Sequence, residues 1–149
     1  MPINEICDRD VVTVGRDSTV IQAAKLMRLR HVGDVVIVEE RDGKRVPVGI
    51  VTDRDVVVEV LATELDPNVI TVGDIMIPSL AVVDEGAGVL EAIRGMAGKG
   101  VRRLPVVDAA GGLVGIVTLD DLLLLLAKEF GALTKLVTLE QKHEANRRR

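Results

Sequence analysis

The sequence contains no tryptophan, no tyrosine and one phenylalanine, Phe130, so aromatic sandwiching of a ligand ring is largely excluded. It also has only one cysteine, Cys7, and two histidines, His31 and His143. A zinc site built on Cys/His spacing is not expected from so few ligands. One cysteine cannot form an intrachain disulfide, which fits a reducing cytoplasm.

Long apolar runs and a strong charge of one sign are also missing. The longest strictly apolar run, Leu122 to Ala127, is far shorter than the ~18 residues that predict a membrane span. The first residues lack the basic region and apolar run of a secretory signal. The formal net charge is −4 at pH 7, so no general attraction for nucleic acid is expected. We therefore expect a cytoplasmic protein with no membrane and no nucleic-acid partner.

No catalytic set of residues is visible. Neither histidine has an evident orienting partner that would make a nucleophile–base pair with Cys7. The glycines around Lys99 do not form a phosphate loop of the form G-x-x-x-x-G-K-[ST]. We therefore expect no enzyme activity, no metal site and no required cofactor.

What the sequence does contain is an internal repeat. The segments 50–56 and 116–122 match at an offset of 66 positions, and upstream of them the offset is 69. The change of offset falls in the turn at 39–47, which is three residues longer than the turn at 108–113. Because insertions concentrate in surface turns, the repeat is interpreted as a true duplication.

Each copy shows the same order of periodic segments. A short strand is followed by an amphipathic helix, two strands that pair across a polar turn, and a second helix that starts near Asp55 or Asp121. Ser18 or Thr19 is expected to cap the first helix, and Gly33 or Gly100 to follow its end. The expected strands are 11–14, 35–38 and 46–51 in the first copy, and 80–83, 104–107 and 113–117 in the second.

This order predicts an α/β (α+β) fold of tandem β-α-β-β-α half-domains, packed with pseudo-twofold symmetry. Thr71 and Asp74 are expected to cap a short helical entry to the second copy. The predicted boundaries are 1–66 for the first motif, 67–130 for the second, and 131–149 for a C-terminal helical tail.

The tail extends the apolar set with Leu133, Leu136, Val137 and Leu139. A helix can continue toward Glu144, with Gly131 as the candidate break point. It either packs on its own domain or forms a homodimer interface, and the second interpretation is favoured.

The paired segments Gly49–Asp55 and Gly115–Asp121, both of the form G-I-V-T-x-x-D, resemble those of the cystathionine-β-synthase-type (CBS) domain pair, or Bateman module. Val101–Asp108 adds the family's strand after the first helix, whereas Val35–Val38 lacks its proline. The resemblance implies two clefts between the half-domains that bind AMP, ATP, S-adenosylmethionine, NAD or related compounds. It also implies dimerisation through helices and control of a regulated protein.

The candidate binding residues lie where a strand gives way to a helix. Asp55 and Asp121 can accept hydrogen bonds from both ribose hydroxyls, and Thr52 and Thr118 offer a hydroxyl to ribose or phosphate. The alternative is that each pair only caps its helix, although both roles can coexist. Apolar walls for the base are expected from Val14, Val36, Ile50, Val83, Pro105 and Ile116.

The two copies differ in charge, because Arg54 stands where the second copy has Asp120. We therefore expect the Asp55 cleft to prefer a nucleotide and the Asp121 cleft to be weaker, empty or suited to a less charged adenosyl compound. Arg102, Arg103 and His31 precede the middle strands and either reach phosphate or are solvated or paired with a carboxylate.

Three functions follow from these observations. The leading hypothesis is a regulatory sensor that binds an adenine nucleotide, AMP or ATP first, and acts on an unknown partner. The alternative is a constitutive dimeric scaffold with vestigial pockets. An enzyme acting on a nucleotide is the least favoured of the three.

Overall fold

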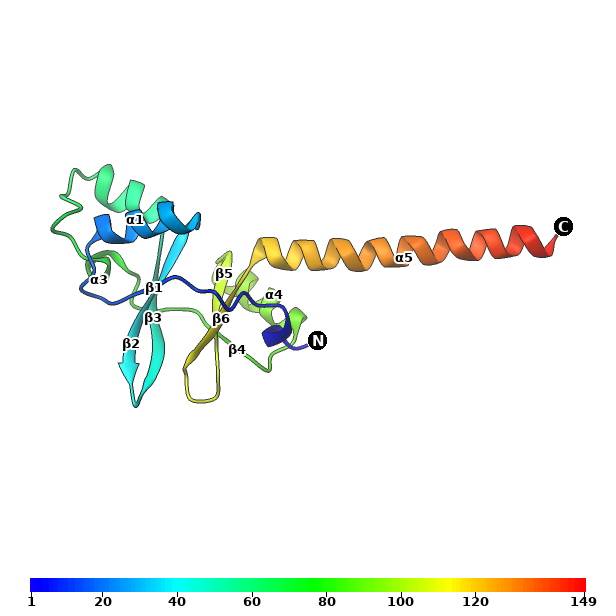
Figure 1. The fold of residues 1–149 in the computed structure, drawn as a ribbon, viewed down its shortest axis with the longest axis horizontal. Helices are drawn as coiled ribbons and strands as arrows, with labels where there is room; N and C mark the ends of the chain where they lie inside the picture. Colours follow the sequence, from blue (N-terminus) through cyan, green and yellow to red (C-terminus); the bar gives the residue numbers. More distant parts are fainter.

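The computed structural model describes all 149 residues as two similar halves with one long helix projecting from them (Figure 1). Each half contains a three-stranded sheet whose middle strand pairs in parallel with a short first strand and antiparallel with the third. The strands are β1 (Thr13–Val14), β2 (Asp34–Arg41) and β3 (Lys44–Thr52), then β4 (Val83–Asp84), β5 (Arg103–Val107) and β6 (Leu113–Thr118). The first strand of each half is shorter than expected.

Helices occupy equivalent places in the two halves. A helix connects the first and second strands, and another follows the third strand, so the α+β fold with two β-α-β-β-α units is confirmed. The helices are η1 (Ile3–Glu5), α1 (Val20–Arg30), α2 (Asp53–Asp55), the π-helical η2 (Val56–Leu61), α3 (Val72–Ile75), α4 (Val89–Lys99) and α5 (Leu119–Arg147).

The ends of α1 arise from local side-chain and backbone chemistry. Thr19, one of the two expected caps, forms a capping box with Gln22. Gly33 follows the end of α1, as expected, but the cap residue itself is His31, which takes the left-handed conformation at φ 54°. Its N–H still reaches the carbonyl of Met27, so the helix closes without glycine. In α4 the same place is taken by Gly100, as expected.

The two halves exchange their leading segments. Ile3 of η1 is buried in the core of the second half, and Asp8 pairs with Ile116 of β6 through two backbone hydrogen bonds of 2.9 Å. Conversely, Val72 of α3 is buried in the core of the first half and donates its N–H to the carbonyl of Ser18. Each core therefore mixes residues from both sides of residue 66, which stays the predicted boundary of the sequence repeat.

The last helix, α5, is continuous from Leu119 to Arg147. The helix continues through Gly131, the candidate break point, because one interior glycine costs a helix only about 1 kcal/mol. The expected tail at 131–149 therefore continues the last helix of the second half. No helix in the protein combines the length and apolar character needed to span a membrane.

Candidate functional site

The threonine and aspartate at the start of α2 form a reciprocal capping box. The Asp55 N–H donates to Thr52 Oγ1 at 3.1 Å, and the Thr52 N–H donates to Asp55 Oδ2 at 2.9 Å. Thr118 and Asp121 repeat this arrangement at 3.2 and 2.9 Å. The expected cap role is therefore present in both copies. It leaves the Thr52 hydroxyl proton and Asp55 Oδ1 without a protein partner.

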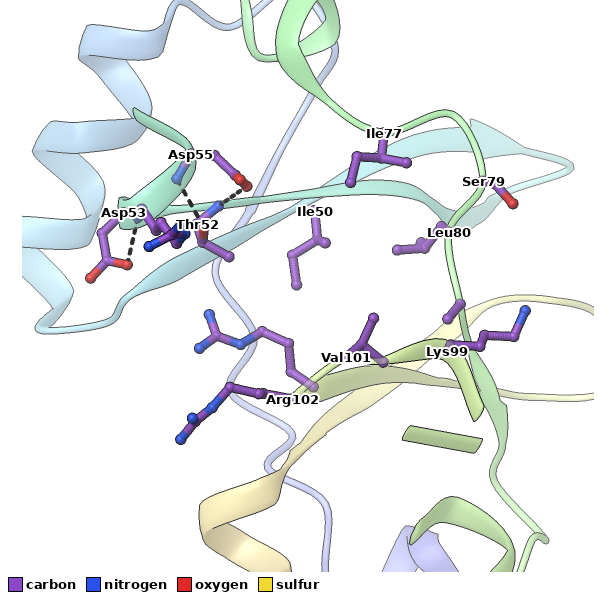
Figure 2. Close-up of a pocket in the computed structure, with 13 residues that line it drawn as sticks. Ile50, Thr52, Asp53, Asp55, Ile77, Ser79, Leu80, Lys99, Val101 and Arg102 are labelled. Atoms are coloured by element: carbon purple, nitrogen blue, oxygen red, sulfur yellow. Dashed lines mark hydrogen bonds between the residues drawn. The ribbon is translucent and has the colours of Figure 1, made fainter. Parts of the chain in front are cut away.

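A cavity of about 680 Å³ opens beside this cap, between the two halves (Figure 2). One wall is the end of β3 and the start of α2, with Ile50, Thr52 and Asp55. The facing wall comes from the second half, from the segment leading to β4 and the region around the end of α4. Ile77, Leu80 and Val101 supply its apolar surface. The volume lies within the range of about 300–1,000 Å³ that small-molecule sites occupy.

Four cationic side chains line the same cavity: Arg54, Lys99, Arg102 and Arg103. Neither Arg54 nor Lys99 forms an ion pair, and Arg102 lies 3.9 Å from the exposed Asp120. Arg103 donates to Asp34 at 2.9 Å. The cavity therefore combines an apolar middle with two unpaired cations, Arg54 and Lys99, that can meet an anion.

The pKa of the Asp34 carboxyl is raised above its ordinary value. Burial is the largest cause, and it outweighs the opposing effect of the Arg103 guanidinium. The nearby Asp53 carboxylate raises the pKa further. The Asp34 carboxylate is thus poorly solvated, and Arg103 is its one close cation.

The structure brings together only part of the predicted set. Thr52, Arg54, Asp55, Ile50 and Arg103 line the cavity. Thr118 and Asp121 lie at the equivalent place in the other half and do not touch it. The remaining predicted wall residues are buried in the halves and do not line the cavity; they are Val14, Val36, Val83, Pro105 and Ile116.

Several lining residues were not predicted from the sequence. Ile77, Ser79, Leu80, Ala81 and Lys99 line the cavity from the second half. Figure 2 shows Ile77 and Leu80 on the side of the cavity that faces Ile50. The repeat marks two of these residues, because polar or charged residues stand at the equivalent positions of the first copy. At an offset of 69, Lys99 and Ser79 stand where the first copy has Arg30 and Asp10.

Two of the four lining cations are replaced by carboxylates in the other half. Arg54 is replaced by Asp120 and Arg103 by Asp34. Arg30, which replaces Lys99, is neutralised by Asp10 through hydrogen bonds of 2.8 and 2.9 Å. The thirteen lining residues include four cations and two carboxylates. Their equivalents include one cation, Arg30, and five carboxylates, namely Asp8, Asp10, Asp34, Asp120 and Asp121.

The backbone closes one cleft and leaves the other open. In the second half, Asp8 covers the free edge of β6 at Ile116. The equivalent residues, Ile77 and Ile50, share no backbone hydrogen bond. Val36 of β2 lies opposite Ile50 of β3, but it donates its N–H to the carbonyl of Val12, on the side of β2 away from β3. Val36 and Ile50 therefore form a non-hydrogen-bonded pair. The N–H and C=O of Ile50 therefore point off the free edge of β3 toward the cavity.

Comparison with known proteins places these features in a family. The CBS domain model matches residues 3–62 and 72–128. An uncharacterised protein of Methanopyrus kandleri is 41% identical over 121 residues, which cover 81% of this chain and 60% of that protein. The chain thus spans less than two thirds of this relative.

The fold is shared with solved structures of other proteins, among them Hypoxic Response Protein I and CBSX2. Hypoxic Response Protein I, solved with two coordinated zinc ions, has a TM-score of 0.71 and 36% identity, and the match covers 81% of this chain and 95% of that one. CBSX2, solved in complex with AMP, has a TM-score of 0.70 and 26% identity, covering 85% and 96%. In this chain no group of three or more His, Cys, Asp or Glu is placed to hold a metal ion. The chain belongs to the CBS-domain family and carries two CBS repeats.

Proposed function

We propose that this chain is a non-enzymatic regulatory module that senses an adenine nucleotide, AMP or ATP first, in the cavity beside Asp55. The observation that carries the proposal is that one cavity holds three features together: Asp55 Oδ1 without a hydrogen-bond partner, an apolar middle, and four cationic side chains. An adenine nucleotide presents a diol, a flat ring and phosphate, which require these three kinds of surface.

The ribose belongs at the cap. Asp55 Oδ2 is committed to the Thr52 N–H, whereas Oδ1 can accept from a ribose hydroxyl. The Thr52 hydroxyl accepts the Asp55 N–H and keeps its own proton to donate to ribose or phosphate. Capping and binding therefore use different atoms of the same two side chains.

The base belongs between the apolar walls. Ile50, Ile77, Leu80 and Val101 face one another across the cavity (Figure 2). Adenine carries a donor next to an acceptor on its edge, and the free C=O and N–H of Ile50 offer the complementary groups. In the other half, the equivalent edge of β6 already holds a backbone partner in this way, since Ile116 pairs with Asp8.

The phosphate belongs among the cations. Arg54 and Lys99 have no carboxylate partner, so an anion beside them does not have to break an existing pair. The equivalent cleft of the other half is acidic and its strand edge is covered by Asp8. We therefore assign nucleotide binding to the Asp55 cleft alone.

The regulated partner is an unidentified protein that distinguishes the ligand-bound arrangement of the halves from the free one. We place the protein in the cytoplasm, as its single cysteine suggests, and expect a homodimer through its helices. The competing function is a constitutive dimeric scaffold whose cavity binds nothing.

Dye-based thermal melting separates these functions, since the lack of tryptophan and tyrosine makes intrinsic fluorescence a poor signal. The panel contains AMP, ADP, ATP, NAD, S-adenosylmethionine and the 2′-deoxy forms of the nucleotides. If the protein is a sensor, binding of a ribonucleotide raises its Tm by mass action, and the 2′-deoxy form of the same nucleotide produces a much smaller rise. No shift with any compound favours the scaffold, and conversion of a nucleotide to product would show an enzyme.

A further inference from the structure

Most of α5 has no partner in the folded chain. Its 29 residues make a rod of about 43 Å. Only its start contacts the body, where Leu122 is buried and the helix meets α4 and β6. From Ala127 onward every residue is exposed, and Figure 1 shows this part projecting away from both halves. Most helices owe their stability to packing, which this part lacks.

An apolar seam runs along the projecting part. Leu123, Leu126, Phe130, Leu133 and Val137 alternate at spacings of three and four residues. Phe130 is 67% exposed and Leu133 is 59% exposed. The opposite face carries a cation every seventh residue, at Lys128, Lys135 and Lys142. This heptad pattern is typical of a helix that packs against another helix through its seam.

The charged residues that follow the apolar seam indicate which helix packs against it and in which direction that helix runs. Glu140 and Glu144 take the next two seam positions, so a parallel pair would set each glutamate against its own copy. An antiparallel pair separates them. It also brings Arg147, and the two arginines after it, to the start of the partner's α5. There Asp120 has a side chain that is 78% exposed.

We infer that two copies of this chain pair through the seam in antiparallel orientation, with Phe130 packed against the partner's Leu133. Val137 then lies opposite the partner's Leu126, and the two pairs of clefts lie at opposite ends of the paired helices. Opposed helix dipoles add to the stability of this arrangement. The inference specifies the dimer of the proposed function, but it does not depend on the ligand, because no residue of α5 lines the cavity.

Disulfide trapping in the full chain tests the orientation, in a Cys7→Ser background. A mixture of Leu126→Cys and Val137→Cys chains should form a covalent dimer on mild oxidation. Each variant alone should not, because its two thiols would lie about 16 Å apart along the pair, beyond the reach of a disulfide. Efficient linkage of Val137→Cys to itself would show a parallel pair and overturn the inference.

Two further variants test the seam. Adding Phe130→Glu to both chains should lower the yield of the mixed disulfide at least tenfold, whereas Lys135→Glu, on the opposite face, should leave it unchanged. Both residues are exposed, so far-UV circular dichroism should show the same fold. An unchanged yield with Phe130→Glu, or a monomeric wild type in analytical ultracentrifugation at all concentrations, would overturn the inference.

Discussion

Asp34 and Arg103 occupy equivalent positions of the two repeats, 69 residues apart, and their side chains pair with each other at 2.9 Å. A symmetric duplication would place two like residues at this point. Here the copies have diverged to opposite charges, so the pair joins the halves. Arg103 also lines the cavity, which makes the asymmetry of the repeats part of the candidate site.

The first prediction concerns the pH dependence of stability. Burial raises the pKa of Asp34 in the folded chain above its ordinary value of 3.8, so the folded state holds this proton more tightly than the unfolded state. The contribution of Asp34 to the free energy of unfolding is therefore full below pH 3.8 and falls as the pH rises through its folded pKa. An Asp34→Asn variant lacks this change.

Chemical denaturation of the wild type and Asp34→Asn from acid to neutral pH measures the effect. The difference in unfolding free energy, wild type minus variant, should decrease as the pH rises. A difference that stays constant or increases would mean that the Arg103 ion pair, rather than burial, governs Asp34.

The second prediction concerns Lys99, which has no ion-pair partner in the cavity, whereas the equivalent Arg30 is held by Asp10. Lys99→Ala should weaken AMP binding roughly 5- to 10-fold in calorimetry, the effect of losing one charged contact to phosphate. Arg30→Ala is the matched control and should leave the affinity within about twofold. Equal losses in the two variants would argue against phosphate near Lys99.

The third prediction concerns the crossing of the leading segment over β6. A Cβ at Gly115 would lie 2.6 Å from the Asp8 carbonyl oxygen and 2.7 Å from Cys7 Sγ. Gly115→Ala should therefore lower the free energy of unfolding by about 1–3 kcal/mol. Gly98→Ala, in α4 with open space around it, should instead stabilise the chain by up to about 1 kcal/mol. A Gly115→Ala variant as stable as the wild type would contradict the described packing.

Part of this structure could be predicted from the sequence. The order of elements and the Thr71–Asp74 cap follow from local periodicity and capping chemistry, which act over a few residues. The exchange of η1 and α3 between the halves could not be predicted, because it depends on contacts such as Asp8 with Ile116, more than 100 residues apart. The left-handed turn at His31 also has no strong local signal.

The same division applies to the cavity. Residues beside the repeated motif, such as Thr52 and Asp55, were found because the motif marks a strand–helix junction. The facing wall, with Ile77 and Lys99, was missed because it joins the site only when the halves pack together. Val36 was assigned to a wall but is fully buried, since a continuous apolar strand does not reveal which residues face a ligand.

The central claim is that one cleft, the one beside Asp55, binds an adenine nucleotide. Calorimetric titration of AMP into Asp55→Asn and Asp121→Asn tests it directly. Asparagine keeps the oxygen that accepts the threonine N–H, so the cap and fold survive while the charge facing the ribose is lost. Asp55→Asn should weaken AMP binding tenfold or more and Asp121→Asn should leave it nearly unchanged, whereas equal losses, or none in either, would contradict the claim.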